Sequence, residues 1–327
     1  SLPQEQRIHV YELDAKTGSL ELVESFATPG APGSLGFDPQ RRFLYASLRS
    51  NSSLAAHRVD AATGRLTAIN AVELPRGENA AFVGTDRTGR WLISASYSAG
   101  KVFVHRLGDD GAIASPMVQT VETAKTAHCV SIDRGNRWVF IPHVAPNAVY
   151  QFKFDSESGK LTAAGQAAGG APGAGPRHLA FHPTLDIAFS SDESGSSVTS
   201  YDFSGESGLK PRQTLSTLPD GYSEKNSTAE VKVHPNGKFV WVSNRGHDSL
   251  AGFSIAADGK LAAIGQTPTE KTPRSFDISP DGLWAFGAGE GSGQVAVFKV
   301  DPATGRLERR QTVAMGKSVS WVTAICD

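Results

Sequence analysis

Short stretches of alternating apolar and polar residues recur along the whole chain, separated by polar turns. In the first complete repeat they cover residues 34–37, 43–47, 54–59 and 66–72. Alternation with a period of two predicts β-strands that are buried on one face. We find no convincing 3.6-residue periodicity, which an amphipathic helix would show. The sequence therefore predicts an all-β protein built from units of four short strands.

Two series of turns set the length of the repeat. The first consists of glycine turns that precede an apolar residue, at Gly18, Gly64, Gly111, Gly159, Gly208, Gly259 and Gly305. The second consists of polar turns, at residues 38–39, 87–89, 134–136, 182–183, 234–237 and 279–282. Four strands in roughly 47 residues is the period of a propeller blade. We therefore expect residues 1–327 to form a single seven-bladed β-propeller domain.

Six of the seven units are complete, so the seventh must be assembled from both ends of the chain. We expect residues 321–325 to form its innermost strand and residues 7–13 and 20–27 its two outer strands. Pairing of the C-terminal strand with the N-terminal strands closes the propeller and removes open sheet edges. Repeat alignment matches residues 1–3 to the end of a second strand, so a few residues are expected to precede Ser1.

Composition and charge narrow the range of partners. Hydrophobic residues make up 39% of the chain, charged residues 20%, and the net charge is −1, so no overall field favours nucleic acid or a membrane. No apolar run is long enough to cross a bilayer. The two cysteines, Cys129 and Cys326, form no disulfide framework, which fits a reducing compartment. We expect a cytoplasmic monomer, with export as the alternative because of the upstream segment.

One face of the predicted propeller collects charged side chains. The first two strands of a blade are antiparallel, so the start of the first and the end of the second lie on the same face. The start positions are Gly33, Ala81, His128, Arg177, Ala229, Arg274 and Ser320. The end positions are Pro3, Arg49, Tyr97, Val144, Glu193, Arg245 and Glu290. Because innermost strands converge on a central channel, these side chains are expected to meet in one concave site.

Several arginines at one site predict an anionic ligand, because a guanidinium binds carboxylate or phosphate through two hydrogen bonds. Each candidate residue occupies one of these positions or lies beside one, and the set is His128, Arg177, Glu193, Arg245, Arg274, His178, Arg49, Tyr97, His143 and Glu290. The alternative is that the charges pair with one another and line a water-filled channel. The sequence contains no motif for a zinc site, a P-loop or a serine nucleophile elbow, so we expect no metal and no cofactor.

Three segments carry a resemblance to a known family. Residues 173–183 (GAGPRHLAFHP), 234–245 (HPNGKFVWVSNR) and 272–282 (TPRSFDISPDG) resemble the seven-bladed lactonase family, and the resemblance covers the whole chain. The family includes a bacterial 6-phosphogluconolactonase and a fungal carboxy-muconate lactonizing enzyme. The resemblance implies a catalytic set of one His, two Arg and one Glu, carried here by His128, Arg177, Arg245 and Glu193. Residues 143–147 (HVAPN) depart from the family's pattern.

The resemblance implies hydrolysis of a sugar lactone, with 6-phosphogluconolactone as the expected substrate. Arg177 or Arg245 is expected to stabilise the charge that develops on the carbonyl oxygen, and Glu193 or His128 to act as general base. Arg274 is expected to hold a phosphate or carboxylate, and His178, Arg49, Tyr97, His143 and Glu290 to contact the substrate. Two alternatives stay open: a lactonizing isomerase or lactonase for a muconate-type lactone, and a non-catalytic binding propeller.

Overall fold

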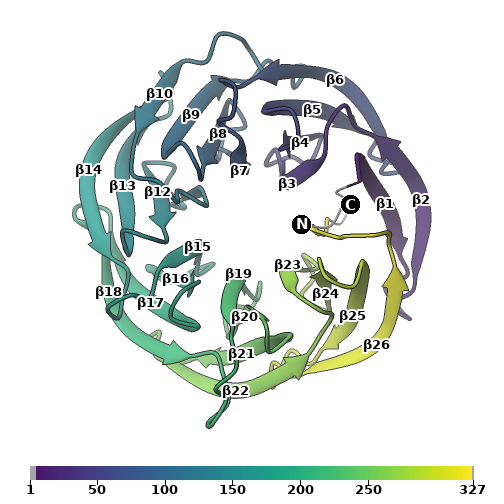
Figure 1. The fold of residues 1–327 in the computed structure, drawn as a ribbon, viewed down its shortest axis with the longest axis vertical. Coiled ribbons are helices and arrows are strands. Elements are labelled where there is room, and N and C mark those ends of the chain that lie inside the picture. Colours follow the sequence, from purple (N-terminus) through teal and green to yellow (C-terminus); the bar gives the residue numbers. More distant parts are fainter. Residues whose placement is uncertain (1–4, 326–327) are drawn as a thin grey trace. The chain divides into compact units, whose positions relative to one another are not determined.

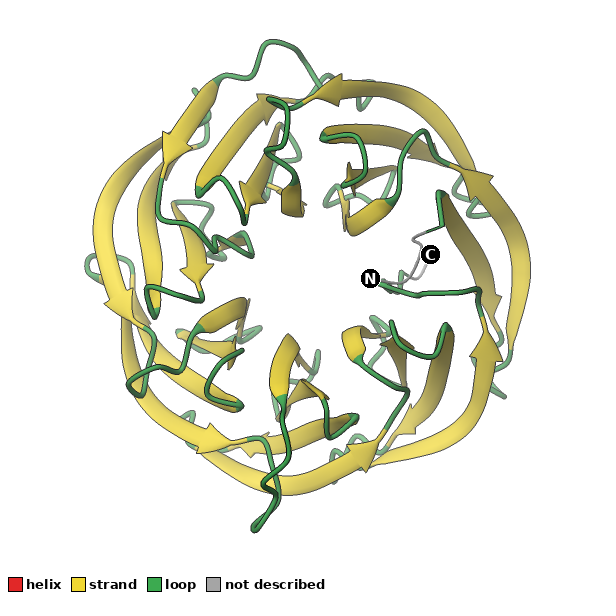
Figure 2. Ribbon diagram, viewed as in Figure 1, coloured by secondary structure: helices red, strands yellow, loops and turns green. Residues whose placement is uncertain are grey.

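A computed structural model describes residues 5–325, which form 26 β-strands joined by turns and loops without any helix (Figure 2). It confirms the predicted all-β class. Within these residues there is accordingly no helix that could cross a membrane. Cys129 is buried. The predictions for Cys326 and for residues 1–3 fall outside the described residues.

Twenty-four strands form six four-stranded antiparallel sheets, in which neighbouring strands follow chain order (Figure 1). The contacts divide the described residues into an N-terminal unit (residues 5–12 and 21–167) and a C-terminal unit (residues 13–20 and 168–325). The sheets of the N-terminal unit are β3 (Pro32–Phe37), β4 (Phe43–Leu48), β5 (Ser53–Val59), β6 (Leu66–Glu73); β7 (Ala80–Thr85), β8 (Trp91–Ser96), β9 (Lys101–Arg106), β10 (Gln119–Glu122); and β11 (Ser131–Ile132), β12 (Trp138–His143), β13 (Ala148–Asp155), β14 (Lys160–Ala168). The sheets of the C-terminal unit are β15 (Pro176–Phe181), β16 (Ile187–Asp192), β17 (Ser197–Ser204), β18 (Gly208–Ser216); β19 (Ser227–Val233), β20 (Phe239–Arg245), β21 (Ser249–Ile255), β22 (Leu261–Pro268); and β23 (Pro273–Ile278), β24 (Trp284–Gly289), β25 (Gln294–Val300), β26 (Leu307–Ala314).

The remaining strands, β1 (Arg7–Leu13) and β2 (Leu20–Ala27), pair with each other in a two-stranded sheet. Their bounds match the two outer strands predicted for the seventh unit. The predicted innermost strand at residues 321–325 is wrong, because no strand is present there. Two backbone N–H groups of this segment instead donate hydrogen bonds to side chains. Val322 N donates to Ser275 Oγ (3.3 Å), and Ala324 N donates to Asp277 Oδ2 (3.0 Å). The strand predicted to pair with it, residues 1–3, lies outside the described residues.

The repeated glycine turns pack closely against the preceding sheet. A Cβ at Gly305 would lie 2.5 Å from the ring of Phe239, and a Cβ at Gly159 would lie 2.5 Å from that of Trp91. The same relation holds between Gly111 and Phe43 and between Gly259 and Ile187, and Gly18 packs in the same way on Trp284 of the last sheet. Each of these glycines also has a positive φ, which residues with a side chain rarely adopt. The glycine series of the sequence therefore marks close contacts between successive sheets.

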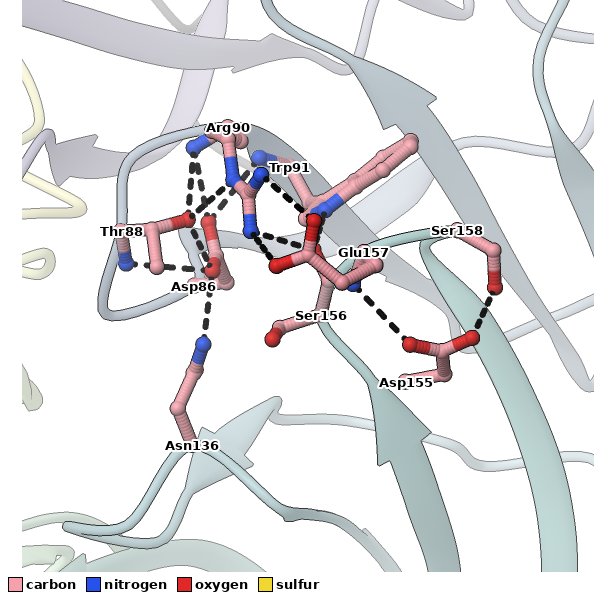
Figure 3. Close-up of polar contacts among 9 residues, drawn as sticks. All are labelled: Asp86, Thr88, Arg90, Trp91, Asn136, Asp155, Ser156, Glu157 and Ser158. Atoms are coloured by element: carbon pink, nitrogen blue, oxygen red, sulfur yellow. Dashed lines mark hydrogen bonds and ion pairs between the residues drawn. The ribbon is translucent and has the colours of Figure 1, made fainter.

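Polar side chains join neighbouring sheets of the N-terminal unit at their turns (Figure 3). Arg90 makes a two-pronged contact with Glu157 (2.8 and 3.3 Å), and Trp91 Nε1 donates to the Ser156 carbonyl (2.8 Å). Asn136 Nδ2 donates to Asp86 Oδ2 (2.9 Å). Glu157 is largely exposed and pairs with Arg90 at the surface, so this cluster joins two sheets and we assign it a structural role.

Apolar cores fill the space between successive sheets. In the C-terminal unit one core joins Phe189 of β16 to Val231 and Val240 of the next sheet, and a second joins Trp241 to Phe276. This packing fixes the first strands β15, β19 and β23 side by side, which is what positions the site.

Candidate active site

The C-terminal unit brings five of the predicted charged residues onto three adjacent sheets. Arg177 and Arg274 follow the prolines that begin β15 and β23. Glu193 directly follows β16, Arg245 is the last residue of β20, and Glu290 directly follows β24. The predicted start and end positions are therefore neighbours within each sheet, as the antiparallel pairing requires.

β-Bulges aim the two arginines that begin the first strands. Pro176 pairs with Asp192 and His178 with Ser191, so Arg177 is the extra residue between them. The register of β23 shifts in the same way at Arg274. A bulge leaves its extra residue outside the ladder and redirects its side chain, and bulges are common beside active sites.

Glu193 bridges two arginines from different sheets. Its Oε1 accepts a hydrogen bond from Arg245 Nη2 at 2.8 Å, and its Oε2 lies 3.4 Å from Arg177 Nε. Arg245 Nη2 also donates to the Thr228 carbonyl at 2.8 Å. A second and looser pair joins Arg274 Nη1 to Glu290 Oε2 at 3.8 Å. Three guanidinium groups thus face two carboxylates, which leaves a net positive charge.

The guanidinium of Arg177 is buried without a full set of acceptors. Its side chain is only 2% exposed, and no described atom accepts a hydrogen bond from its Nη1. The buried Nε of Arg245 also has no acceptor among the described atoms. A buried donor without a partner costs free energy, and a charged one costs more. An anionic ligand that accepted these hydrogen bonds would remove that cost.

The electrostatic environment keeps Glu193 ionised. Burial raises the pKa of Glu193, but the charges of Arg177, Arg245 and Arg274 lower it by more, so the net shift is downward. Burial and the charges of the two other arginines lower the pKa of Arg177, against the opposing effect of Glu193. The arginines thus repel one another, and Glu193 is the group that holds Arg177 and Arg245 together.

His178 points between two sheets and pairs with a carboxylate that the sequence did not single out. His178 Nδ1 lies 2.7 Å from Glu230 Oε1, and both side chains are buried. Burial lowers the pKa of His178, which favours the neutral imidazole. The equivalent position in other sheets carries Ser34, whose hydroxyl accepts from Val83 N, and Ser275. The His178–Glu230 pair therefore joins β15 to β19 where hydroxyl groups join other sheets.

A further buried carboxylate, that of Asp192, lies at the end of β16 directly before Glu193. Asp192 accepts hydrogen bonds from the hydroxyl groups of Ser190 (2.5 Å), Ser197 (2.8 Å) and Thr199 (2.7 Å). Burial raises the pKa of Asp192 to about 7, although these three hydrogen bonds lower it. An acidic residue at the end of an apolar strand, followed by Glu193, was the only sequence signal for this role.

The other predicted residues lie in the N-terminal unit. His128 is buried and meets the ring of Tyr97 edge to face, with 5.6 Å between centroids. The stem of Arg49 lies against Gly33, where a Cβ would come within 2.4 Å of Arg49 Cδ.

His143 is fully buried, and both of its ring nitrogens contact the protein. Nδ1 lies 2.8 Å from the Ile141 carbonyl, Nε2 lies 3.1 Å from Thr123 Oγ1, and the ring packs on Tyr150. Burial lowers the pKa of His143 to about 4. This geometry favours a packing role for His143 over the predicted substrate contact. Among residues 5–325, no cluster of three or more His, Cys, Asp or Glu side chains could hold a metal ion.

Comparison with known proteins identifies close relatives along the whole chain. A family model described as "Lactonase, 7-bladed beta-propeller" matches residues 2–324. The chain is 33% identical to a 6-phosphogluconolactonase of Pectobacterium carotovorum and 32% identical to one of Yersinia enterocolitica, each over 99% of this chain and 96% of the relative. A periplasmic gluconolactonase of Pseudomonas aeruginosa superimposes with a TM-score of 0.89 at 26% identity, over 97% of this chain and 94% of that chain.

Proposed function

Because this chain belongs to the lactonase family of seven-bladed β-propellers, we propose that it hydrolyses a sugar lactone and that 6-phosphogluconolactone is its substrate. The observation that carries the proposal is the buried Arg177, whose Nη1 has no acceptor among the described atoms beside a second arginine held by Glu193. Full-length relatives named 6-phosphogluconolactonase support the choice of substrate.

Arg177 is proposed to stabilise the transition state. Water attacks the lactone carbonyl carbon, and the carbonyl oxygen gains negative charge before the ring C–O bond breaks to give a carboxylate and a hydroxyl group. Removing one well-placed donor to such an oxyanion typically slows catalysis by about a hundredfold to a thousandfold. Arg177 suits this task because its bulge fixes the backbone and its burial keeps water from weakening the interaction.

Glu193 is proposed to orient the arginines rather than to accept the proton of the attacking water. Its two oxygens already contact Arg177 and Arg245, and its lowered pKa makes it a weak base. Of the two bases predicted from the sequence, we therefore retain His128. Arg245 shares the carbonyl or carboxylate oxygen with Arg177 through its buried Nε.

Arg274 is proposed to bind the phosphate group. Its pair with Glu290 is long at 3.8 Å, and both side chains are about a quarter exposed, so a phosphate can replace the carboxylate. Of the remaining predicted contacts, Arg49 and Tyr97 keep that role, and His178 supports the site from between two sheets.

We also propose that the chain forms one closed domain with a seventh blade made from both ends. Gly18 packs on Trp284 as Gly305 packs on Phe239, and Gln311 Nε2 donates to the Gly18 carbonyl (2.6 Å). Val322 N donates to Ser275 Oγ as Val83 N donates to Ser34 Oγ. The β1–β2 hairpin and residues 321–325 thus make the contacts of an outer hairpin and an inner segment. We further propose a monomer that acts in the cytoplasm, with export as the alternative.

The first test compares hydrolysis of 6-phosphogluconolactone with that of gluconolactone, each above its spontaneous rate. We expect rapid turnover of the phosphorylated lactone by the wild type. We expect Arg177→Ala to lower kcat/KM by about a hundredfold or more while the circular dichroism spectrum is unchanged. Wild-type activity retained in Arg177→Ala contradicts the role of Arg177, and no acceleration of either lactone contradicts the proposed function.

The structural similarity to a periplasmic gluconolactonase supports one alternative substrate. If the unphosphorylated lactone is turned over faster, gluconolactone takes the place of its phosphate ester, and Arg274 then has no phosphate to hold. A carboxylated muconate-type lactone is the remaining alternative and is tested in the same assay.

A further inference from the structure

We infer that Asn226 is a positioning residue of the proposed lactonase site, an inference that rests on the proposed function. Asn226 is the last residue of the loop 217–226, which joins β18 to β19. It lies outside every motif noted in the sequence. Its amide connects the turn that carries Glu193 to the turn that carries Arg245, and these turns belong to different sheets.

Both ends of the Asn226 amide are used for this connection. Nδ2 donates to Ser196 Oγ (3.0 Å), three residues after Glu193, and to Asn244 Oδ1 (3.0 Å), directly before Arg245. Oδ1 accepts a hydrogen bond from His247 N at 3.1 Å, two residues after Arg245. A side chain must offer donors and an acceptor at this spacing to replace it, which Asp, Ser and Ala do not.

The other end of the loop strengthens the same connection. Thr217 N and Thr217 Oγ1 both donate to the Ser196 carbonyl (2.9 and 2.8 Å), and Thr217 Oγ1 also lies 2.7 Å from Asn244 Oδ1. The loop is seated directly on the Arg245 turn, because a Cβ at Gly246 would overlap the Lys225 carbonyl. Both ends of the loop therefore contact Ser196 and Asn244 and fix the distance between these two residues.

The distance between the two turns determines the contact that orients the arginines. Glu193 and Arg245 meet at 2.8 Å only while their turns stay at this separation, and Glu193 in turn holds Arg177. Without the Asn226 amide we expect the turns to move apart and the guanidinium groups to lose their alignment with the substrate. Misplacement by about 1 Å can cost up to a hundredfold in rate.

The test compares Asn226→Ala with a matched control, Gln213→Ala. The Gln213 amide exchanges two hydrogen bonds with the backbone of Leu261 (2.9 and 3.1 Å), so it joins the same two sheets at another place. We expect kcat/KM for 6-phosphogluconolactone to fall by about tenfold in Asn226→Ala and by less than about twofold in Gln213→Ala, at similar losses of Tm. Equal effects of the two variants on kcat/KM overturn the inference.

A double-mutant cycle separates positioning from general loosening. If Asn226 acts through Glu193, then Asn226→Ala has less than about a twofold effect in a Glu193→Gln background. Additive effects overturn the inference. Asn226→Asp keeps the shape of the side chain but loses its donors, and it replaces the alanine variant if that variant folds poorly.

Binding of 6-phosphogluconate, measured by calorimetry, distinguishes a failure of the proposed hydrolysis from a failure of the role inferred for Asn226. A wild type that binds this compound without turnover overturns only the proposed hydrolysis, and the Kd values of the same variants then decide the role of Asn226. A wild type that neither binds nor turns over overturns both.

Discussion

At the scale of single residues, the site consists of groups that can touch a ligand and groups that hold them. Arg177, Arg245 and Arg274 offer donors, while Glu193 pairs with the first two. Asp192 directly precedes Glu193, and its carboxylate accepts hydrogen bonds from three hydroxyl groups. Asp192 can therefore be replaced without changing a residue that is proposed to contact the substrate.

Asp192 is expected to make stability depend on pH. Burial raises its pKa from the ordinary 3.8 to about 7, so between these values the folded protein keeps a proton that the unfolded chain releases. The free energy of unfolding therefore falls as pH rises through this range. Asp192→Asn removes the effect, and the variant should gain on the order of 2–4 kcal/mol relative to wild type between pH 4 and pH 8.

Urea denaturation at several pH values measures this gain. Asn is compatible with the position, because Asn244 pairs with Ser249 just as Asp192 pairs with Ser197. Asp220→Asn, which removes an exposed carboxylate, serves as control. A stability difference between wild type and Asp192→Asn that is the same at every pH contradicts the prediction.

The sequence could predict functional residues that differ from the residue type at the same position of other repeats. It could not predict residues whose role depends on a partner in another sheet. Arg177 and Arg245 stand where other repeats carry alanine, glycine or valine, so comparing positions found them. Glu230 and Asn226 act through partners in another sheet, at distances set by how sheets pack. No spacing along the chain contains that information.

At the scale of elements, glycine turns such as the one at Gly305 pack an outer hairpin against a neighbouring sheet. We expect Gly305→Ala to lower the free energy of unfolding by about 1–3 kcal/mol more than Gly221→Ala does. Both glycines have a positive φ, but a Cβ at Gly305 meets Phe239, whereas nothing lies within 4 Å of one at Gly221. Urea denaturation of both variants measures the difference, and equal losses would show that only the backbone conformation matters.

Strand boundaries were predictable because polar turns separate the strands, although β4, β8 and β24 are buried along their whole length and not on one face only. The four strands predicted in the first repeat agree with β3, β4, β5 and β6 to within two residues at either end. Residues 321–325 have the composition of a strand, yet the N–H groups of Val322 and Ala324 donate to side chains of Ser275 and Asp277. The structure assigns no strand to these residues, and the partner predicted for them, residues 1–3, lies outside the described part of the chain.

At the scale of the whole molecule, the C-terminal segment covers the last sheet. Val319, Val322 and Ala324 pack against the core of Trp284 and Phe286. Removing residues 319–327 should therefore lower the Tm by about 5 °C or more, since full burial of a valine contributes roughly 1.5–3 kcal/mol and Val319 and Val322 are both partly buried. A chain that ends at Ile325 keeps these contacts and is the control. Equal Tm values for the two chains would show that the segment does not support the fold.

The recurring bulge has a consequence for how such a protein can change its specificity. The register shifts at the start of the first strand in several sheets, at Ala81 as well as at Arg177 and Arg274. Each of these sheets thus has one position where a side chain is already turned out of the ladder, whatever its identity. Duplication of an ancestral unit would supply several such positions, and single substitutions could then add or remove a charge while the sheets stay intact. Ala81 and its counterparts are accordingly natural starting points for directed evolution toward other acidic substrates.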